Sequence, residues 1–176
     1  MVARRQRGGR PVRKTGSKTF RYTVDASVFV NAFNPHEEGH TDSMAILTAI
    51  QQTGDPIIVP TLVLPEIAAA VARAINDSTG ALQYANATAA LPHLTIVSLT
   101  PATARQAAQL AASHRLRGAD AVYVAVARRY GTTLVSQDEE QRLRGSAAVT
   151  CQTSEEALHA REVPKRVRRS RPPRAR

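Results

Sequence analysis

A length of 176 residues suits one compact domain and gives no support to a two-domain chain. An apolar content of 43% excludes a chain that is disordered throughout, and a single cysteine excludes an internal disulfide and fits a reducing cytoplasm. The net charge of +10 belongs to the two ends, because residues 1–21 carry +8 and residues 161–176 carry +7, which leaves residues 22–160 at −5.

Short runs of β-branched residues alternate along the chain with longer, alanine-rich stretches of helical periodicity. Up to residue 91, the predicted elements are a strand over 20–24, a helix over 27–33, a helix over about 41–52, a strand over 57–59, a helix over about 61–76 and a helix over about 79–91. Thr61 is expected to be the N-cap of its helix. Pro65 is tolerated there because it lies near the first turn.

The second half continues the alternation. Its predicted elements are a strand over 94–99, a helix over about 100–115, a helix over 120–130, a strand over 132–136, a short helix after 138 and a last short strand near 147–150. Pro101 suits the first turn of its helix, and Gly131 ends the next one. Parallel strands need crossover connections, so this order predicts an α/β fold, a three-layer α/β/α sandwich with a central parallel sheet.

The two ends are basic segments on a mildly acidic globule. Like-charged blocks that contain proline and glycine usually stay disordered and often contact polyanions. We therefore expect disordered arms over 1–21 and 161–176, with nucleic-acid contact favoured over passive solvated tails. Residues 1–21 lack the apolar run of a signal peptide, and the most apolar stretch, 57–72, is too short and too interrupted to span a bilayer. A soluble, cytoplasmic protein is expected.

Two acidic residues follow strands of the predicted sheet. Asp25 stands at the carboxyl end of the first strand, and Asp138 lies two residues past Ser136, at the end of another. Open α/β sheets bind their ligands outside the carboxyl ends of the strands. Asp25 and Asp138 are therefore expected at one rim of the sheet, although they are far apart in sequence.

Two further acids lie in apolar helical stretches. Glu66 stands within residues 62–71 and Asp120 within residues 118–127, where a carboxylate costs free energy unless it is paired or coordinated. Taken singly, an acid near a helix start has a plainer interpretation, as a cap or as a group that complements the helix dipole. Four such acids at one sheet edge favour a shared site instead.

Four blocks around these acids resemble the four acidic motifs of PIN domains, particularly the VapC-like toxin ribonucleases. The blocks are residues 24–30, the helix that contains Pro65-Glu66-Ile67, residues 116–127 and residues 131–138. The resemblance runs over about residues 22–151 in the right order, and the third and fourth blocks are the most specific. It implies a PIN-like nuclease domain over 22–160, between the two arms.

The resemblance also implies a function. PIN ribonucleases cleave RNA endonucleolytically with Mg²⁺ or Mn²⁺ and leave a 5′-phosphate, and a toxin of this kind implies a homodimer and a cognate antitoxin protein as partner. The implied residues are four metal-binding acids, Asp25, Glu66, Asp120 and Asp138, and two supporting serines, Ser27 and Ser136. The family more often has threonine near its last acid, where this chain has Ser136.

The chemistry explains why such a site needs carboxylates. Hard divalent cations prefer oxygen ligands, and Mg²⁺ is usually held by a few carboxylates together with substrate phosphate oxygens. The metal lowers the pKa of a bound water and neutralises charge on the leaving oxygen. Without metal, four clustered carboxylates repel one another and should hold a proton between them, so activity is expected to fall as the pH drops.

Two smaller features have competing interpretations. His36 and His40 satisfy the H-E-x-x-H pattern of zinc proteases, which requires both histidines on one face of a stable helix and a third ligand farther on. Pro35 and Gly39 favour a solvated loop that enters a helix. Arg117 lies three residues before Asp120, and it could either contact substrate phosphate or pair with an acid of the site.

Two other classes of function stay open. A haloacid-dehalogenase-like phosphatase also has an Asp after its first strand, but its chemistry needs a second Asp two residues later, where this chain has Ser27. The other class is a catalytically silent PIN-like module that binds RNA through its arms. The full set of four acids argues against it.

Overall fold

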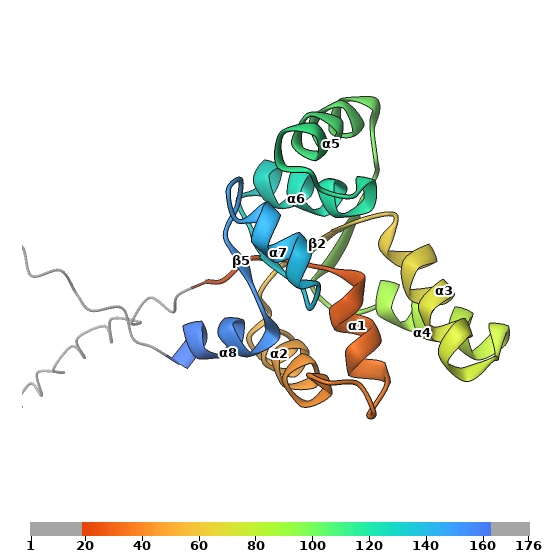
Figure 1. Cartoon of the computed structure of the whole chain (residues 1–176). Coiled ribbons are helices and arrows are strands. Elements are labelled where there is room, and N and C mark those ends of the chain that lie inside the picture. Colours follow the sequence, from red (N-terminus) through yellow and green to blue (C-terminus); the bar gives the residue numbers. More distant parts are fainter. Residues whose placement is uncertain (1–18, 163–176) are drawn as a thin grey trace, which may run out of the picture.

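The computed structural model describes residues 19–162 (Figure 1). In that range five strands form one sheet in the order β3-β2-β1-β4-β5, and every neighbouring pair is parallel. The strands are β1 Tyr22–Val24, β2 Ile57–Pro60, β3 Leu94–Val97, β4 Thr133–Val135 and β5 Cys151–Gln152. The prediction of an α/β fold with a central parallel sheet is confirmed.

Helices cover both faces of this sheet. They are α1 Ala26–Phe33, α2 His40–Thr53, α3 Val63–Ile75, α4 Ser78–Ala89, α5 Pro101–His114, α6 Gly118–Tyr130, α7 Glu139–Gly145 and α8 Ser154–Glu162. Figure 1 shows α5 and α6 on one side of the strands and α1, α2 and α8 on the other. No helix in the described part of the chain is long and apolar enough to cross a membrane.

The core is densest around α6, which contacts β1, β2 and β4. All seven residues from Ala121 to Ala127 are buried, so this helix is enclosed on every side. Asp120 stands just before this buried run, in the first turn of the helix. The apolar sequence that follows Asp120 therefore fixes its carboxylate at the end of a rigid core element.

Two predicted helix signals are confirmed, because Pro101 lies in the first turn of α5 and Gly131 ends α6 with a φ of 61°. The structure adds that Asp25 caps α1 and that Thr100 caps α5. The prediction that Thr61 caps α3 is wrong. That helix begins at Val63 after Leu62, which makes no side-chain capping bond, because the backbone of residues 61–62 still turns out of β2.

Two elements near the carboxyl end differ from the sequence prediction. The last strand occupies Cys151–Gln152 rather than the predicted 147–150, because residues 146–148 still turn out of α7. Helix α8 was not predicted at all. Its sequence is mostly polar and buries only Ser154 and Ala157, so it carries little apolar periodicity.

The first and last parts of the described chain meet at the edge where the strands begin. Arg161 forms a buried ion pair with Asp55 at 2.8 Å and donates to the hydroxyl of Tyr22 at 3.2 Å. Its guanidinium lies 5.0 Å from the ring centroid of Phe20, whose backbone N–H donates to Asp55 at 3.0 Å. The predicted arms lie outside the described residues, apart from 19–21 and 161–162.

Candidate functional site

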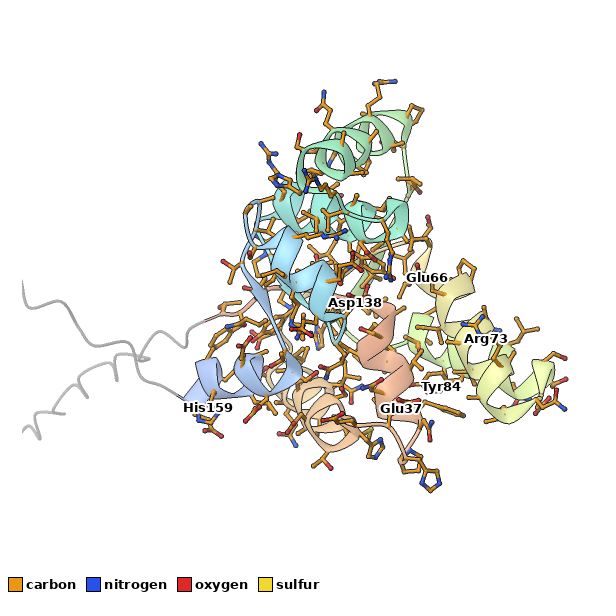
Figure 2. The ribbon with its side chains drawn as sticks, viewed as in Figure 1. Glu37, Glu66, Arg73, Tyr84, Asp138 and His159 are labelled. Atoms are coloured by element: carbon orange, nitrogen blue, oxygen red, sulfur yellow. The ribbon has the colours of Figure 1, made fainter. Side chains whose placement is uncertain are left out.

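A pocket of about 640 Å³ lies at the opposite rim, where β1 and β4 end. All four acids singled out in the sequence line it, together with Ser27. They come from four different parts of the chain, namely the start of α1, the first turns of α3 and α6, and the loop before α7. Figure 2 labels two of them, Glu66 on α3 and Asp138 just before α7.

Asp25 is the most buried of the four acids, with 8% of the residue exposed. Its Oδ1 accepts a hydrogen bond from the backbone N–H of Ser27 at 2.8 Å, and its Oδ2 accepts one from Nε2 of Gln141 at 3.2 Å. Burial raises the pKa of this carboxyl, and the hydrogen bonds from Ser27 and Gln141 oppose that shift in part. Asp25 therefore has a fixed orientation, and burial destabilises its charged form.

Ser27 and Ser136 hold the loop that carries Asp138. The hydroxyl oxygen of Ser27 accepts from the backbone N–H of Gln137 at 3.0 Å, and that of Ser136 accepts from the backbone N–H of Asp138 at 3.0 Å. The two hydroxyl oxygens lie 3.5 Å apart. Asp138 in turn caps α7 by accepting from the backbone N–H of Gln141 at 2.8 Å. Both serines thus position the last acid, although Ser136 itself is fully buried.

Glu66 projects from the first turn of α3 toward α6. The hydroxyl of Tyr123 donates to its Oε2 at 2.6 Å. Burial raises the pKa of Glu66 to about 7, the Tyr123 hydrogen bond opposes the shift, and the charges of Asp25 and Asp120 add to it. Near neutral pH this carboxyl is therefore close to half-protonated without a cation.

Asp120 shares the same electrostatic environment. Its pKa is raised to about 6, chiefly by burial and also by the charges of Asp138 and Asp25, while the charge of Arg117 lowers it. Raised carboxyl pKa values at neighbouring positions in a concave pocket are a recognised mark of a functional site.

Arg117 pairs with acids at the rim of the pocket. Its guanidinium lies 2.8 Å from Oε2 of Glu140 and 3.5 Å from Oδ2 of Asp138. Glu140 also pairs with Arg144 at 2.6 Å. Of the two interpretations open for Arg117, the structure contains the ion pair. The side chain is nevertheless 65% exposed, so a surface pair of this kind is weak and exchangeable.

Sequence reasoning did not find two neutral residues of the site, Tyr123 and Gln141. Both are fully buried, at 1% and 0% exposed, and each donates to one of the acids. Tyr123 lies in an apolar run that predicts core, and Gln141 lies in a polar run that predicts surface. The only available signal was their spacing of three residues after Asp120 and after Asp138, which places them on the next turn of the same helix.

The histidine pair of residues 36–40 does not form a zinc-protease helix. Residues 35–39 are turns and bends, and α2 begins at His40, so only the second histidine is helical. The ring Nδ1 of His40 lies 2.8 Å from the carbonyl oxygen of Asn31. The prediction of a loop that enters a helix is confirmed.

The donor chemistry of the pocket fits a hard divalent cation. Its acids and Ser27 offer oxygen donors. In their present orientations, no three acidic, histidine or cysteine side chains of residues 19–162 are close enough together to hold a metal ion. Glu66 is turned toward Tyr123, and Asp138 toward α7 and Arg117, so metal binding requires these carboxylates to rotate.

Comparison with known proteins identifies a family. The family model described as the PIN domain matches residues 22–145. No curated protein matches the sequence.

Several solved structures are similar in fold. The structure of VapBC2 from Rickettsia felis, bound to a DNA fragment from its promoter, is 13% identical in sequence to this chain and has a TM-score of 0.58. The match covers 76% of this chain and 98% of that chain. VapC20 from Mycobacterium tuberculosis, a sarcin-ricin loop cleaving toxin, is 19% identical with a TM-score of 0.59, covering 70% and 95%. FitAcB from Neisseria gonorrhoeae is 18% identical with a TM-score of 0.58, covering 76% and 98%. At these identities the likeness establishes the fold alone.

Proposed function

The chain belongs to the PIN-domain family, and from this membership we propose that it is a metal-dependent endoribonuclease that hydrolyses RNA phosphodiesters. The observation that carries the proposal is the convergence of Asp25, Glu66, Asp120 and Asp138 on one pocket from four separate elements. We assign these four residues as ligands of Mg²⁺ or Mn²⁺. When bound, the cation would supply Lewis acidity and countercharge at the scissile phosphate.

The protein's own groups prepare this chemistry. Ser27 and Ser136 hold the loop of Asp138, and Asp25 is held at both carboxylate oxygens. The site therefore spends little free energy on ordering Asp25 when it binds a cation. The acids must lose their shared protons first, which gives the proposed activity an acid limb.

Two arginines are suited to contact the RNA backbone. Arg73 is exposed and lines the pocket on the same face of α3 as Glu66, about two turns farther along, so it can pair with a phosphate next to the scissile one (Figure 2). Arg117 sits on the opposite side, where its weak ion pair with Asp138 can be exchanged for a substrate phosphate. A cation held by Asp138 would weaken this pair, although the closer pair of Arg117 with Glu140 would also have to open.

We propose further that the enzyme is the toxin of a toxin–antitoxin pair, a homodimer that acts in the cytoplasm with a cognate antitoxin as its partner. The support is the likeness in fold to VapC20, described as a toxin, and to VapBC2 and FitAcB. Induced expression should arrest growth, and expression of the adjacent reading frame should relieve the arrest. Relief that fails with every neighbouring frame would contradict the toxin proposal and leave the nuclease proposal intact.

The central experiment is RNA cleavage by the purified full chain as Mg²⁺ or Mn²⁺ is titrated against EDTA. Internal cuts that need the metal and leave 5′-phosphates, detected by a 5′-phosphate-dependent exonuclease, support the proposal. RNA binding without cleavage at any metal concentration would favour the silent module. Faster hydrolysis of p-nitrophenyl phosphate than of RNA would favour the phosphatase.

A further inference from the structure

Gln141 contacts two of the four pocket acids at once. Its side-chain Nε2 donates to Oδ2 of Asp25 at 3.2 Å, and its backbone N–H donates to Oδ1 of Asp138 at 2.8 Å. The residue is 0% exposed and lies on α7, one helical turn after Asp138. A single glutamine thus bridges carboxylates from opposite ends of the domain sequence.

The rest of this amide is left unsatisfied. Its Oε1 is buried and has no hydrogen-bond partner within residues 19–162. A buried polar atom without a partner costs free energy, and an apolar side chain of similar length would avoid that cost. If the side-chain amide of Gln141 were turned round, its Oε1 would face Oδ2 of ionised Asp25, and its NH₂ group would have no acceptor. Fold stability alone therefore does not explain a glutamine at this position.

We propose that Gln141 is a positioning residue, whose side chain holds the carboxylate of Asp25 in place for a divalent cation. The inference rests on the proposed function. Without the side-chain bond of Gln141, Asp25 would keep hydrogen bonds from Ser27 alone, and its Oδ2 would lose the Gln141 donor. Outer-shell donors of this kind orient metal ligands without touching the metal.

The test separates metal binding from folding. In Gln141→Met the apolar side chain has a similar length, and the backbone bond to Asp138 persists. We expect Mn²⁺ affinity, measured by titration calorimetry on the full chain, to weaken about 10–100-fold. The melting temperature in EDTA should change little, because the variant removes the unpaired Oε1 but also removes the donor to Oδ2 of Asp25. Gln83→Met, an exposed position on α4, is the matched control and should change neither value.

Each outcome bears on the inference. Unchanged Mn²⁺ affinity in Gln141→Met would overturn it. A fall in the EDTA melting temperature in both Gln141→Met and Gln141→Leu would show a structural role instead, and would also overturn it. A wild-type chain that neither binds Mn²⁺ nor cleaves RNA would overturn the proposed function, a failure distinct from that of Gln141 alone.

Discussion

The hydroxyl of Tyr123 donates a hydrogen bond to Oε2 of Glu66 at 2.6 Å, from a side chain that is 1% exposed. This bond lowers the pKa of Glu66 against the effect of burial, which raises it to about 7. In Tyr123→Phe the pKa of Glu66 should rise further, because the charged form loses a donor. The acid limb of the rate against pH should therefore move to higher pH, with the fold retained.

The control for this variant is Tyr130→Phe, at the far end of the same helix. Its pH profile should match that of the wild type. An unshifted profile in Tyr123→Phe would mean that Glu66 does not titrate in the rate-limiting step.

The acids themselves give the second prediction. Asp25→Asn, Glu66→Gln and Asp120→Asn should each abolish metal-dependent RNA cleavage while the circular dichroism spectrum is kept. Asp138→Asn should be equally severe. Glu140 is already paired with Arg117 at 2.8 Å and with Arg144 at 2.6 Å, so it does not take over the role of Asp138 as a metal ligand.

Asp77→Asn is the matched control, since Asp77 caps α4 and does not line the pocket. Its activity should be that of the wild type, because asparagine also caps helices well. A near wild-type rate in any of the four pocket variants, measured across a metal titration, would remove that residue from the ligand set.

The positions of the acids show how far the sequence determines the site. Asp25 and Asp138 could be placed at one rim because parallel strands end at the same edge, and that edge is where the pocket lies. Glu66 and Asp120 lie on helices, whose approach to that edge depends on packing. Their place in the same site as Asp25 and Asp138 was predicted from the family resemblance.

The donors behind the acids were beyond sequence reasoning for a physical reason. Tyr123 and Gln141 reach Glu66 and Asp25 because α6 packs against the sheet and α7 packs against α6 and β5, which no local pattern encodes. The same limit explains α8, which is stabilised by contacts with α2 and β5 rather than by an apolar stripe of its own. Local propensity is a weak guide where tertiary contacts decide the outcome.

Stability should depend on pH in an unusual direction. Burial raises the pKa of Glu66 from 4.5 to about 7 and that of Asp120 from 3.8 to about 6. Between those values the folded state binds more protons than the unfolded chain, so the free energy of unfolding should fall as the pH rises from about 4 to about 7. After allowance for solvent, the loss is on the order of 1 kcal/mol per group.

Thermal melts in EDTA across this pH range measure the effect. Glu66→Gln should flatten the dependence, because it removes one of the acids whose pKa burial raises. Mn²⁺ should raise the melting temperature more at pH 8 than at pH 5, since only deprotonated acids bind it. Stability that rises with pH across the window would contradict the buried charges described here.

The histidine pair gives a prediction of no effect. His36→Ala and His40→Ala should each retain RNA cleavage, because residues 35–39 form a loop and the pair does not share a helix face. His40→Ala should lose about 1 kcal/mol of stability with its bond to the Asn31 carbonyl. Loss of activity together with loss of stoichiometric zinc would overturn this assignment.

The last prediction concerns the two basic arms. Deletion of residues 1–18 and 163–176 spares every described residue, including the Arg161 contacts with Asp55 and Phe20 that join the two ends. Each deleted segment carries seven Lys or Arg residues, so the two should contribute equally. Their attachment lies at the edge where the strands begin, opposite the acidic pocket, so we propose that they capture RNA away from the scissile phosphate.

Capture by phosphate neutralisation has a salt signature. The slope of log affinity against log salt is about −0.7 per phosphate contacted on a single strand. Each single deletion should flatten that slope by a similar amount, and the double deletion should weaken binding most at low salt. The value of kcat at saturating RNA should survive, because contacts made equally in the ground and transition states change KM alone. An unchanged slope would show that the arms are passive, whereas a lost kcat with an intact fold would show that an arm reaches the pocket.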